Sequence, residues 1–178
     1  SFKVFMHSWE VGLKNIFSKL YQPEVMLVEN NSIYEEEISK RFTSSWKHRS
    51  AYSHLSAALS RKKCLTLVKE YEKEGLNNSF DVVVTYRPDV LLWKDMKLAP
   101  KLPSLRTNIY VNGYTGGDFH FIMNSINAQR FSKLYDYGFN GGFVAKHAWI
   151  GHYIKTQMKM SITPDDIFPG RDQEVIGK

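Results

Sequence analysis

The feature that most constrains the fold is an apolar segment, residues 80–89, whose sequence is FDVVVTYRPD. Residues 82–84 are three consecutive valines without polar alternation, which is typical of a strand covered on both faces in the middle of a parallel or mixed sheet. Pro88 cannot donate to a sheet ladder, so regular pairing is expected to stop near Arg87. The segment predicts a layered α/β fold in which a buried strand ends in polar residues.

This strand end is also a candidate ligand site. In open α/β sheets, ligands bind outside the carboxyl ends of the strands. Arg87 is suited to phosphate oxygens and Asp89 to a hard divalent cation, so a metal-bound diphosphate fits this position. The alternative interpretation is a surface turn with a local ion pair. The segment by itself does not decide between the two.

Length and composition predict one globular domain. The chain has 178 residues, of which 43% are hydrophobic and 14% aromatic, enough for a substantial core. No apolar run approaches the ~20 residues that cross a bilayer, so no transmembrane segment is expected. No signal-peptide pattern is visible, and a cytoplasmic location is expected, in host cytoplasm if the chain is virus-encoded. Cys64 is the single cysteine, which excludes an intrachain disulfide and predicts a small core residue.

The net charge of +6, from 24 basic and 18 acidic residues, favours anionic partners such as nucleotides, nucleic acid or anionic lipid surfaces. Two short basic clusters, residues 47–49 and 61–63, stand out. No RNP-like, zinc-finger or basic-zipper pattern accompanies them, so they are expected to be solvated helix faces. A non-catalytic basic module that binds nucleic acid or an anionic glycan is the alternative to a nucleotide-binding enzyme.

Strand-like and helix-like segments alternate along the chain, which is the main sequence signal for an α/β fold. Strands are expected at residues 2–6, 23–29, 80–87, 109–112 and 119–123. Helices are expected at residues 12–20, 45–74, 128–137 and 144–158, and a further helix is expected after Ser32, which would cap it. The helix at 128–137 is expected to be capped by Asn127 or Ser125. Residues 93–103 are expected to form a loop, and residues 165–172 a polar tail.

A second candidate site is the glycine-rich loop of residues 113–117, which leads to Asp118 at the start of an expected strand. A carboxylate there is suited to take a proton from a hydroxyl acceptor, or to hold that hydroxyl in place. The alternative is a glycine-rich hairpin whose aspartate accepts backbone hydrogen bonds. The loop is neither a P-loop nor a dinucleotide fingerprint, because no Gly-Lys-Ser or Gly-Lys-Thr follows and a strand comes next.

Further candidates lie on the first expected strand and on the long helix. His7 and Trp9 are at the end of that strand, on the expected ligand edge. Trp9 is suited to stack on a base or sugar, although large aromatic side chains more often belong to the core. Tyr52, early in the long helix, is expected to face the same crevice. His147 and His152 are on different faces of the last expected helix, so a joint metal site there is not expected.

These pieces follow one another in an order that resembles small GT-A-type glycosyltransferases, including virus- and bacteria-encoded enzymes of surface-glycan synthesis. The matching segments are residues 5–9, 23–29, 51–53, 80–90 and 117–125, so the resemblance covers most of the chain. It implies a single GT-A-like (Rossmann-like) domain over residues 1–178, with a mixed, mainly parallel sheet flanked by helices. It also implies a further strand upstream of Ser1.

The resemblance implies transfer of a sugar from a nucleotide-diphosphate donor, with a UDP-sugar favoured, to a hydroxyl of a glycan or glycoprotein acceptor. Asp89 would hold Mn²⁺ or Mg²⁺, which neutralises the leaving diphosphate as the glycosidic bond breaks. Asp118 would be the catalytic base of an inverting mechanism or a sugar-binding residue of a retaining one. Residues implied to bind the donor and its nucleotide are His7, Trp9, Tyr52, Thr85, Tyr86 and Arg87. Nucleic acid is not an expected partner.

The metal site departs from the family pattern. The usual Asp-x-Asp is absent, because Arg87 stands at the position of the first aspartate. Metal binding would then depend on Asp89 together with diphosphate oxygens, water or a residue such as His152. Mg²⁺ accepts such an arrangement, since it commonly keeps several waters and uses one or two carboxylates.

Overall fold

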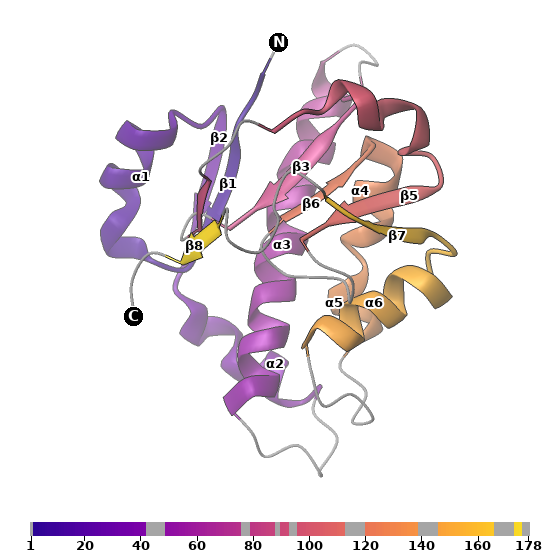
Figure 1. The fold of residues 1–178 in the computed structure, drawn as a ribbon. Coiled ribbons are helices and arrows are strands. Elements are labelled where there is room, and N and C mark those ends of the chain that lie inside the picture. Colours follow the sequence, from indigo (N-terminus) through magenta and orange to yellow (C-terminus); the bar gives the residue numbers. More distant parts are fainter. Residues whose placement is uncertain are drawn as a thin grey trace. The chain divides into compact units, whose positions relative to one another are not determined.

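The computed structural model describes residues 2–41, 49–75, 79–87, 90–92, 96–112, 120–138, 146–165 and 173–175 (Figure 1). The chain forms two compact units. Unit 1 comprises Ser1–Asn78 and Ser132–Gly142, and unit 2 comprises Ser79–Phe131 and Phe143–Lys178. Both units combine strands with helices, which confirms the α/β class. The single GT-A-like domain stays a prediction.

Unit 1 is built on a parallel pair of short strands, β1 (Phe5–Ser8) and β2 (Val25–Val28). The connection between them contains a 3-10 turn, η1 (Val11–Leu13), and a helix, α1 (Lys14–Tyr21). This confirms the expected strand–helix–strand order. Parallel pairing requires such a crossover, because a tight turn can only join antiparallel strands.

The other elements of unit 1 in the described residues are helices: η2 (Asn31–Tyr34), α2 (Glu35–Ser39), α3 (Arg49–Glu74) and α5 (Leu134–Tyr137). The expected Ser32 cap is wrong, because the side chain of Asn30 accepts from the Ser32 N–H at 3.0 Å and so begins η2. α3 packs against β1. Its buried apolar residues recur at helical spacing, at positions Ala51, Leu55, Ala58, Leu59, Leu65 and Val68.

Unit 2 contains a four-stranded sheet in the order β3-β6-β5-β7. Its strands are β3 (Val83–Tyr86), β6 (His120–Met123), β5 (Asn108–Val111) and β7 (Ser161–Pro164). β6 is antiparallel to both of its neighbours, whereas β5 and β7 are parallel. The sheet is mixed, as expected, but not mainly parallel. The stretch between β5 and β6 is too short for a helical crossover, so β6 returns antiparallel.

β6 is one of the two inner strands of this sheet and the more deeply buried of them. All four of its side chains have exposures of 0%, and it lies between β3 and β5. The expectation that the valine run forms the middle strand is wrong for this sheet, because β3 is at one end of the strand order. Val83 is buried, but Val84 and the residues up to Tyr86 are half-buried. β-Branched residues favour a strand, and long-range pairing decides where that strand lies.

Several other elements of unit 2 differ from expectation. A 3-10 helix, η3 (Ala99–Ser104), occupies part of the expected loop, and β4 (Val90–Leu92) pairs antiparallel with β8 (Gln173–Val175). The expected helix 128–137 is two helices, α4 (Ser125–Phe131) and α5, and the break coincides with the change of unit at Ser132. Asn124, not Ser125 or Asn127, caps α4, because its side chain accepts from the Asn127 N–H at 2.8 Å.

α6 (Lys146–Thr156) confirms the last expected helix over its described residues. Trp149, Ile150 and Ile154 from this helix are buried in the core of unit 2 together with Phe121 and Phe131. Among the described residues, no helix has both the length and the apolar character needed to cross a membrane.

Candidate functional site

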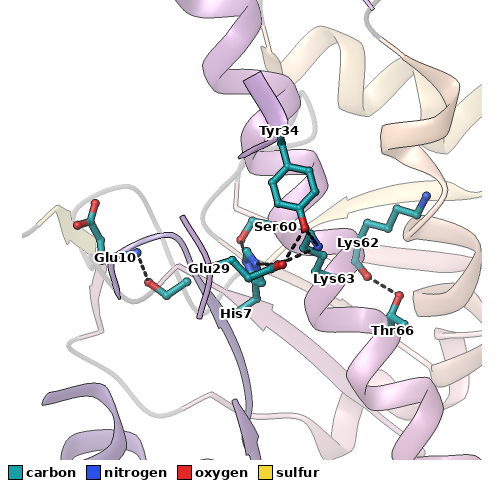
Figure 2. Close-up of polar contacts among 9 residues, drawn as sticks. His7, Glu10, Glu29, Tyr34, Ser60, Lys62, Lys63 and Thr66 are labelled. Atoms are coloured by element: carbon teal, nitrogen blue, oxygen red, sulfur yellow. Dashed lines mark hydrogen bonds and ion pairs between the residues drawn. The ribbon is translucent and has the colours of Figure 1, made fainter. Parts of the chain in front are cut away.

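A polar cluster lies at the carboxyl ends of β1 and β2 (Figure 2). His7 belongs to β1 and Glu29 directly follows β2, so the parallel pairing brings them to one edge. His7 Nε2 lies 3.2 Å from Glu29 Oε2. Tyr34 from η2, and Ser60 and Lys63 from α3, complete the group. We call these five residues the β1–β2 cluster.

Glu29 is the centre of the β1–β2 cluster. Tyr34 Oη donates to its Oε1 at 2.7 Å, and Lys63 Nζ lies 2.8 Å from its Oε2. Burial by itself raises the pKa of Glu29, but hydrogen bonds from Lys63, Tyr34 and His7 outweigh burial and lower that pKa below its ordinary value. Burial likewise opposes the charged form of Lys63, yet its bonds to Glu29 and Tyr34 raise the Lys63 pKa. The network therefore favours the charged form of both groups.

His7 connects the carboxylate to α3. Its side chain is fully buried, and burial lowers the pKa of His7 below its ordinary value despite the opposing effect of Glu29. A neutral imidazole carries one N–H, which we assign to Nε2 because Glu29 accepts there. Nδ1 then accepts from the Ser60 hydroxyl at 2.7 Å. Ser60, His7 and Glu29 form a hydroxyl–imidazole–carboxylate chain.

The hydrogen-bonded series Ser60–His7–Glu29 contains the groups of a hydrolytic triad but lacks the surroundings of one. Ser60 lies within α3, where backbone N–H groups are used by the helix and cannot bind an oxyanion. The His7 side chain is fully buried, so a substrate cannot reach the imidazole to exchange a proton with it. We therefore assign these three hydrogen-bonded residues a structural role, in which they join β1, β2 and α3.

Trp9 extends the cluster toward the edge. Its ring packs edge-on against His7, with ring centroids 4.3 Å apart, and lies 5.5 Å from the Tyr34 ring. The indole Nε1 is buried and has no hydrogen-bond partner among the described residues. His7 and Trp9, two residues predicted to border a nucleotide, are therefore in direct contact.

Tyr52, the third such residue, lies on the same face of α3 as the cluster. Positions 52, 56, 60 and 63 are spaced by three or four residues and so recur on one side of the helix. Ser56, between Tyr52 and Ser60, accepts from the Asn31 side chain at 3.0 Å. Burial, with the Glu35 carboxylate nearby, raises the pKa of Tyr52. The predicted nucleotide-bordering residues thus lie on one side of unit 1.

The β1–β2 cluster makes stability sensitive to mild acid. The folded-state pKa of His7 lies below its ordinary value of 6.5, so the unfolded chain binds the proton first and the free energy of unfolding falls below that pH. The lowered pKa of Glu29 adds a further loss below its ordinary value of 4.5. We expect the urea midpoint to fall between neutral pH and about pH 5.5, and to fall less in His7→Gln, which retains a donor toward Glu29. Parallel falls in both proteins would contradict this account.

A second group of polar residues lies at one edge of the unit 2 sheet. β3, β5 and β7 end at this edge and β6 begins there, since Tyr86 is opposite His120 and Val111 is opposite both Phe121 and Pro164. The residues that follow the three strand ends are Arg87, Asn112 and Asp165. We call this the unit 2 strand-end edge.

Asp165 organises a buried ionic group at this edge. Its Oδ1 lies 2.7 Å from Lys101 Nζ and its Oδ2 lies 3.3 Å from His120 Nε2. Lys101 Nζ also lies 4.5 Å from the centroid of the Tyr110 ring. Sequence reasoning missed this group, because it assigned Asp165 to a polar tail. The sequence did contain one signal for it, because His120 lies inside an otherwise apolar predicted strand.

The predicted site residues of the β3 region are only partly described. The Thr85 hydroxyl is buried with no partner among the described residues, and Tyr86 and Arg87 are half-buried. The predicted metal ligand Asp89, the predicted catalytic Asp118 and the glycine-rich loop 113–117 lie outside the described residues. Within the described ranges, no group of three or more His, Cys, Asp or Glu side chains could hold a metal ion.

The basic cluster 61–63 is used inside unit 1. Lys62 Nζ lies 2.6 Å from Asp136 Oδ1, and Lys63 pairs with Glu29. The expectation of a solvated face is wrong for Lys63, whose side chain is only 19% exposed. The side chains of the other basic cluster, residues 47–49, lie outside the described residues.

Comparisons with known protein families, curated proteins and solved structures give no match for this chain. Inference of function therefore starts from its own residues and their geometry.

Proposed function

We propose that this chain is a metal-dependent glycosyltransferase. It would move a sugar from a nucleotide-diphosphate donor, with a UDP-sugar favoured, to a hydroxyl of a glycan acceptor. The observation that carries the proposal is the unit 2 strand-end edge, where Tyr86 and His120 face each other across neighbouring strands. In the sequence, Asp89 follows the first of these residues closely and Asp118 closely precedes the second.

The residue types at this edge suit a nucleotide-diphosphate donor. Arg87 offers charge-assisted hydrogen bonds to phosphate oxygens, and the Thr85 hydroxyl has no partner among the described residues. Asp165 already binds Lys101 and His120, so it is not available to a cation. A bound Mn²⁺ or Mg²⁺ would therefore be held by Asp89, diphosphate oxygens and water, and would neutralise the leaving group. Asp118 would act on the sugar and acceptor side.

Within unit 1, two aromatic side chains keep the predicted role of contacting a nucleotide. Trp9 and Tyr52 are suited to contact a base or ribose, and Trp9 retains a buried N–H with no partner among the described residues. His7 has a different role in this proposal. Because both of its nitrogens are engaged, it positions Trp9 rather than touching the donor.

The alternative, a non-catalytic basic module for nucleic acid or an anionic glycan, is less favoured. Lys62 and Lys63, part of the pattern that suggested it, are each paired with a carboxylate of unit 1. Such pairs reduce the positive charge presented to an external anion.

Asp89→Ala should lower metal-dependent transfer or hydrolysis of the donor by at least about 100-fold while the melting temperature is unchanged, because the variant loses the proposed protein ligand of the metal. Asp81→Ala is the matched control, since Asp81 is an exposed aspartate just before β3. Activity is measured as nucleotide release from a panel of nucleotide sugars with and without Mn²⁺. Full activity in Asp89→Ala would overturn the metal assignment.

Binding provides a separate test that does not require the acceptor. A ligand that binds only the folded state raises the melting temperature, by an amount that corresponds to about 2.7 kcal/mol at a concentration of 100 Kd. UDP-sugars with Mn²⁺ should produce such a rise. Salt-sensitive oligonucleotide binding without any response to nucleotide sugars would favour the basic module instead.

A further inference from the structure

α1 and the turn before it expose an apolar stripe. η1 and α1 contain no buried residue. Leu13, Ile16 and Leu20 have exposures of 39%, 51% and 70%, and their spacing returns them to one side of a helix. Five of the nine exposed large apolar side chains in the described residues lie between residues 11 and 21, so this is a patch and not a scatter of single residues.

Polar and basic residues occupy the rest of the helix surface. With 100° between successive residues of a helix, Lys19 lies at one border of the stripe and Phe17 at the other. Ser18 lies opposite the stripe, and Lys14 lies on the flank of the helix beyond Phe17. Residues 11–23 contain no aspartate or glutamate. The segment is therefore amphipathic, with Lys19 beside its apolar face and a second positive charge, Lys14, on its flank.

The position of α1 within unit 1 leaves this face available. Phe17 is the half-buried member of the helix, and its ring centroid lies 6.3 Å from that of Tyr21. α3 packs on β1, and Figure 1 shows α1 beside β2, away from α3. The stripe is thus not used in the described core of unit 1.

We propose that α1 is an interfacial helix that lies on an anionic lipid surface. The stripe of Leu13, Ile16 and Leu20 would enter the headgroup region. Lys19 at its border and Lys14 on the flank of the helix would extend their long side chains to lipid phosphates. The net charge of +6 adds attraction to such a surface. A second copy is a poorer occupant, because symmetric packing of two such helices would bring lysines together while residues 11–23 supply no aspartate or glutamate to offset them. The inference rests on α1 alone and is independent of the proposed function.

Vesicle flotation tests the apolar stripe. The wild-type protein should bind vesicles of phosphatidylcholine with phosphatidylglycerol, and bind pure phosphatidylcholine more weakly. Ile16→Ser combined with Leu20→Ser should lower affinity for the anionic vesicles at least about tenfold, because each loses an inserted aliphatic side chain. Ile33→Ser combined with Ile126→Ser is the matched control, since both isoleucines are exposed and lie outside the stripe. Equal loss in the two double variants would overturn the proposal.

A second pair of variants tests the two lysines of α1. Lys14→Gln combined with Lys19→Gln should weaken binding by about 30-fold, from about 1 kcal/mol for each lysine near the surface. Lys97→Gln combined with Lys155→Gln changes the net charge equally at exposed lysines elsewhere, and should have a smaller effect. If the two double variants weaken binding equally, the attraction is non-specific and α1 is not the binding element.

Insertion itself is read from a fluorophore attached to an introduced cysteine. Cys64 should remain unlabelled, because burial raises its pKa to about 11 and its thiol donates to the Phe5 carbonyl. A polarity-sensitive label at Ile16→Cys should shift to the blue on anionic vesicles, whereas the same label at Asn15→Cys should not. Equal responses would overturn the proposal. The proposal would also be overturned if the wild-type protein formed a dimer without lipid and the double variant Ile16→Ser with Leu20→Ser were a monomer. A second copy would then cover the stripe.

Discussion

Asp165→Asn should lower the free energy of unfolding by about 3–5 kcal/mol, because it removes the counter-charge of a buried ammonium. The Asp165 side chain is fully buried and its carboxylate lies 2.7 Å from Lys101 Nζ. It also faces His120, which is equally buried. Asparagine has nearly the same shape, so the loss reports charge and not a cavity. The measurement is urea unfolding followed by circular dichroism.

Two comparisons separate this explanation from a general effect of the substitution. Asp136→Asn breaks the ion pair between Asp136 and Lys62, and the side chains of both residues are much more exposed than those of the buried pair. This substitution should lower the free energy of unfolding by no more than about 1 kcal/mol. Adding Lys101→Met to Asp165→Asn removes the unpaired ammonium and should recover part of the loss. A cost below about 1 kcal/mol for Asp165→Asn, against the 3–5 kcal/mol expected for a broken buried pair, would contradict the buried charge pair.

Phe121→Ala should have a comparable effect, with a loss of about 3–5 kcal/mol in the free energy of unfolding. Phe121 is fully buried in the inner strand β6, and its ring centroid lies 4.7 Å from that of Phe131. Alanine leaves a cavity that neighbours on β3 and β5 cannot fill without moving the paired strands. Denaturant titration of the two proteins under the same conditions measures the difference.

The controls for Phe121→Ala test the position of β6 in the sheet. Ile122→Val, on the next position of the same strand, should cost about 0.5–1.5 kcal/mol. Val84→Ala, on the half-buried outer strand β3, should cost less than Phe121→Ala. If Val84→Ala were the more destabilising substitution, β3 would be the better packed strand and the assigned strand order would be wrong.

Local patterns predicted the helices well and the strand positions less well. The helix expected over residues 45–74 is confirmed by α3 over its described residues, and apolar residues from Ala51 to Val68 are buried at helical spacing. The three valines predicted a strand correctly but not its place in the sheet. Helical periodicity is a property of neighbouring residues, whereas the centre of a sheet depends on partners far along the chain.

The two polar groups show the same limit. His7 was predicted as a site residue from its place at a strand end, but its partners Glu29 and Lys63 were not. The group of Lys101, His120 and Asp165 was missed entirely, because its members are far apart in the sequence and meet only through the pairing of β5, β6 and β7. Asp89 and Asp118, which lie outside the described residues, stay predictions.

From the residues alone follow the α/β class, the strand–helix–strand order at the start of the chain, and the helical spacing of apolar residues in α1, since each depends on periodicity within a short segment. Tertiary structure alone decided that β6 is an inner, antiparallel strand, that Lys63 is enclosed by its ion pair, and that the α1 stripe stays exposed. The physical reason is range: propensity acts between neighbours along the chain, while burial and charge pairing act between residues that only the folded chain brings together.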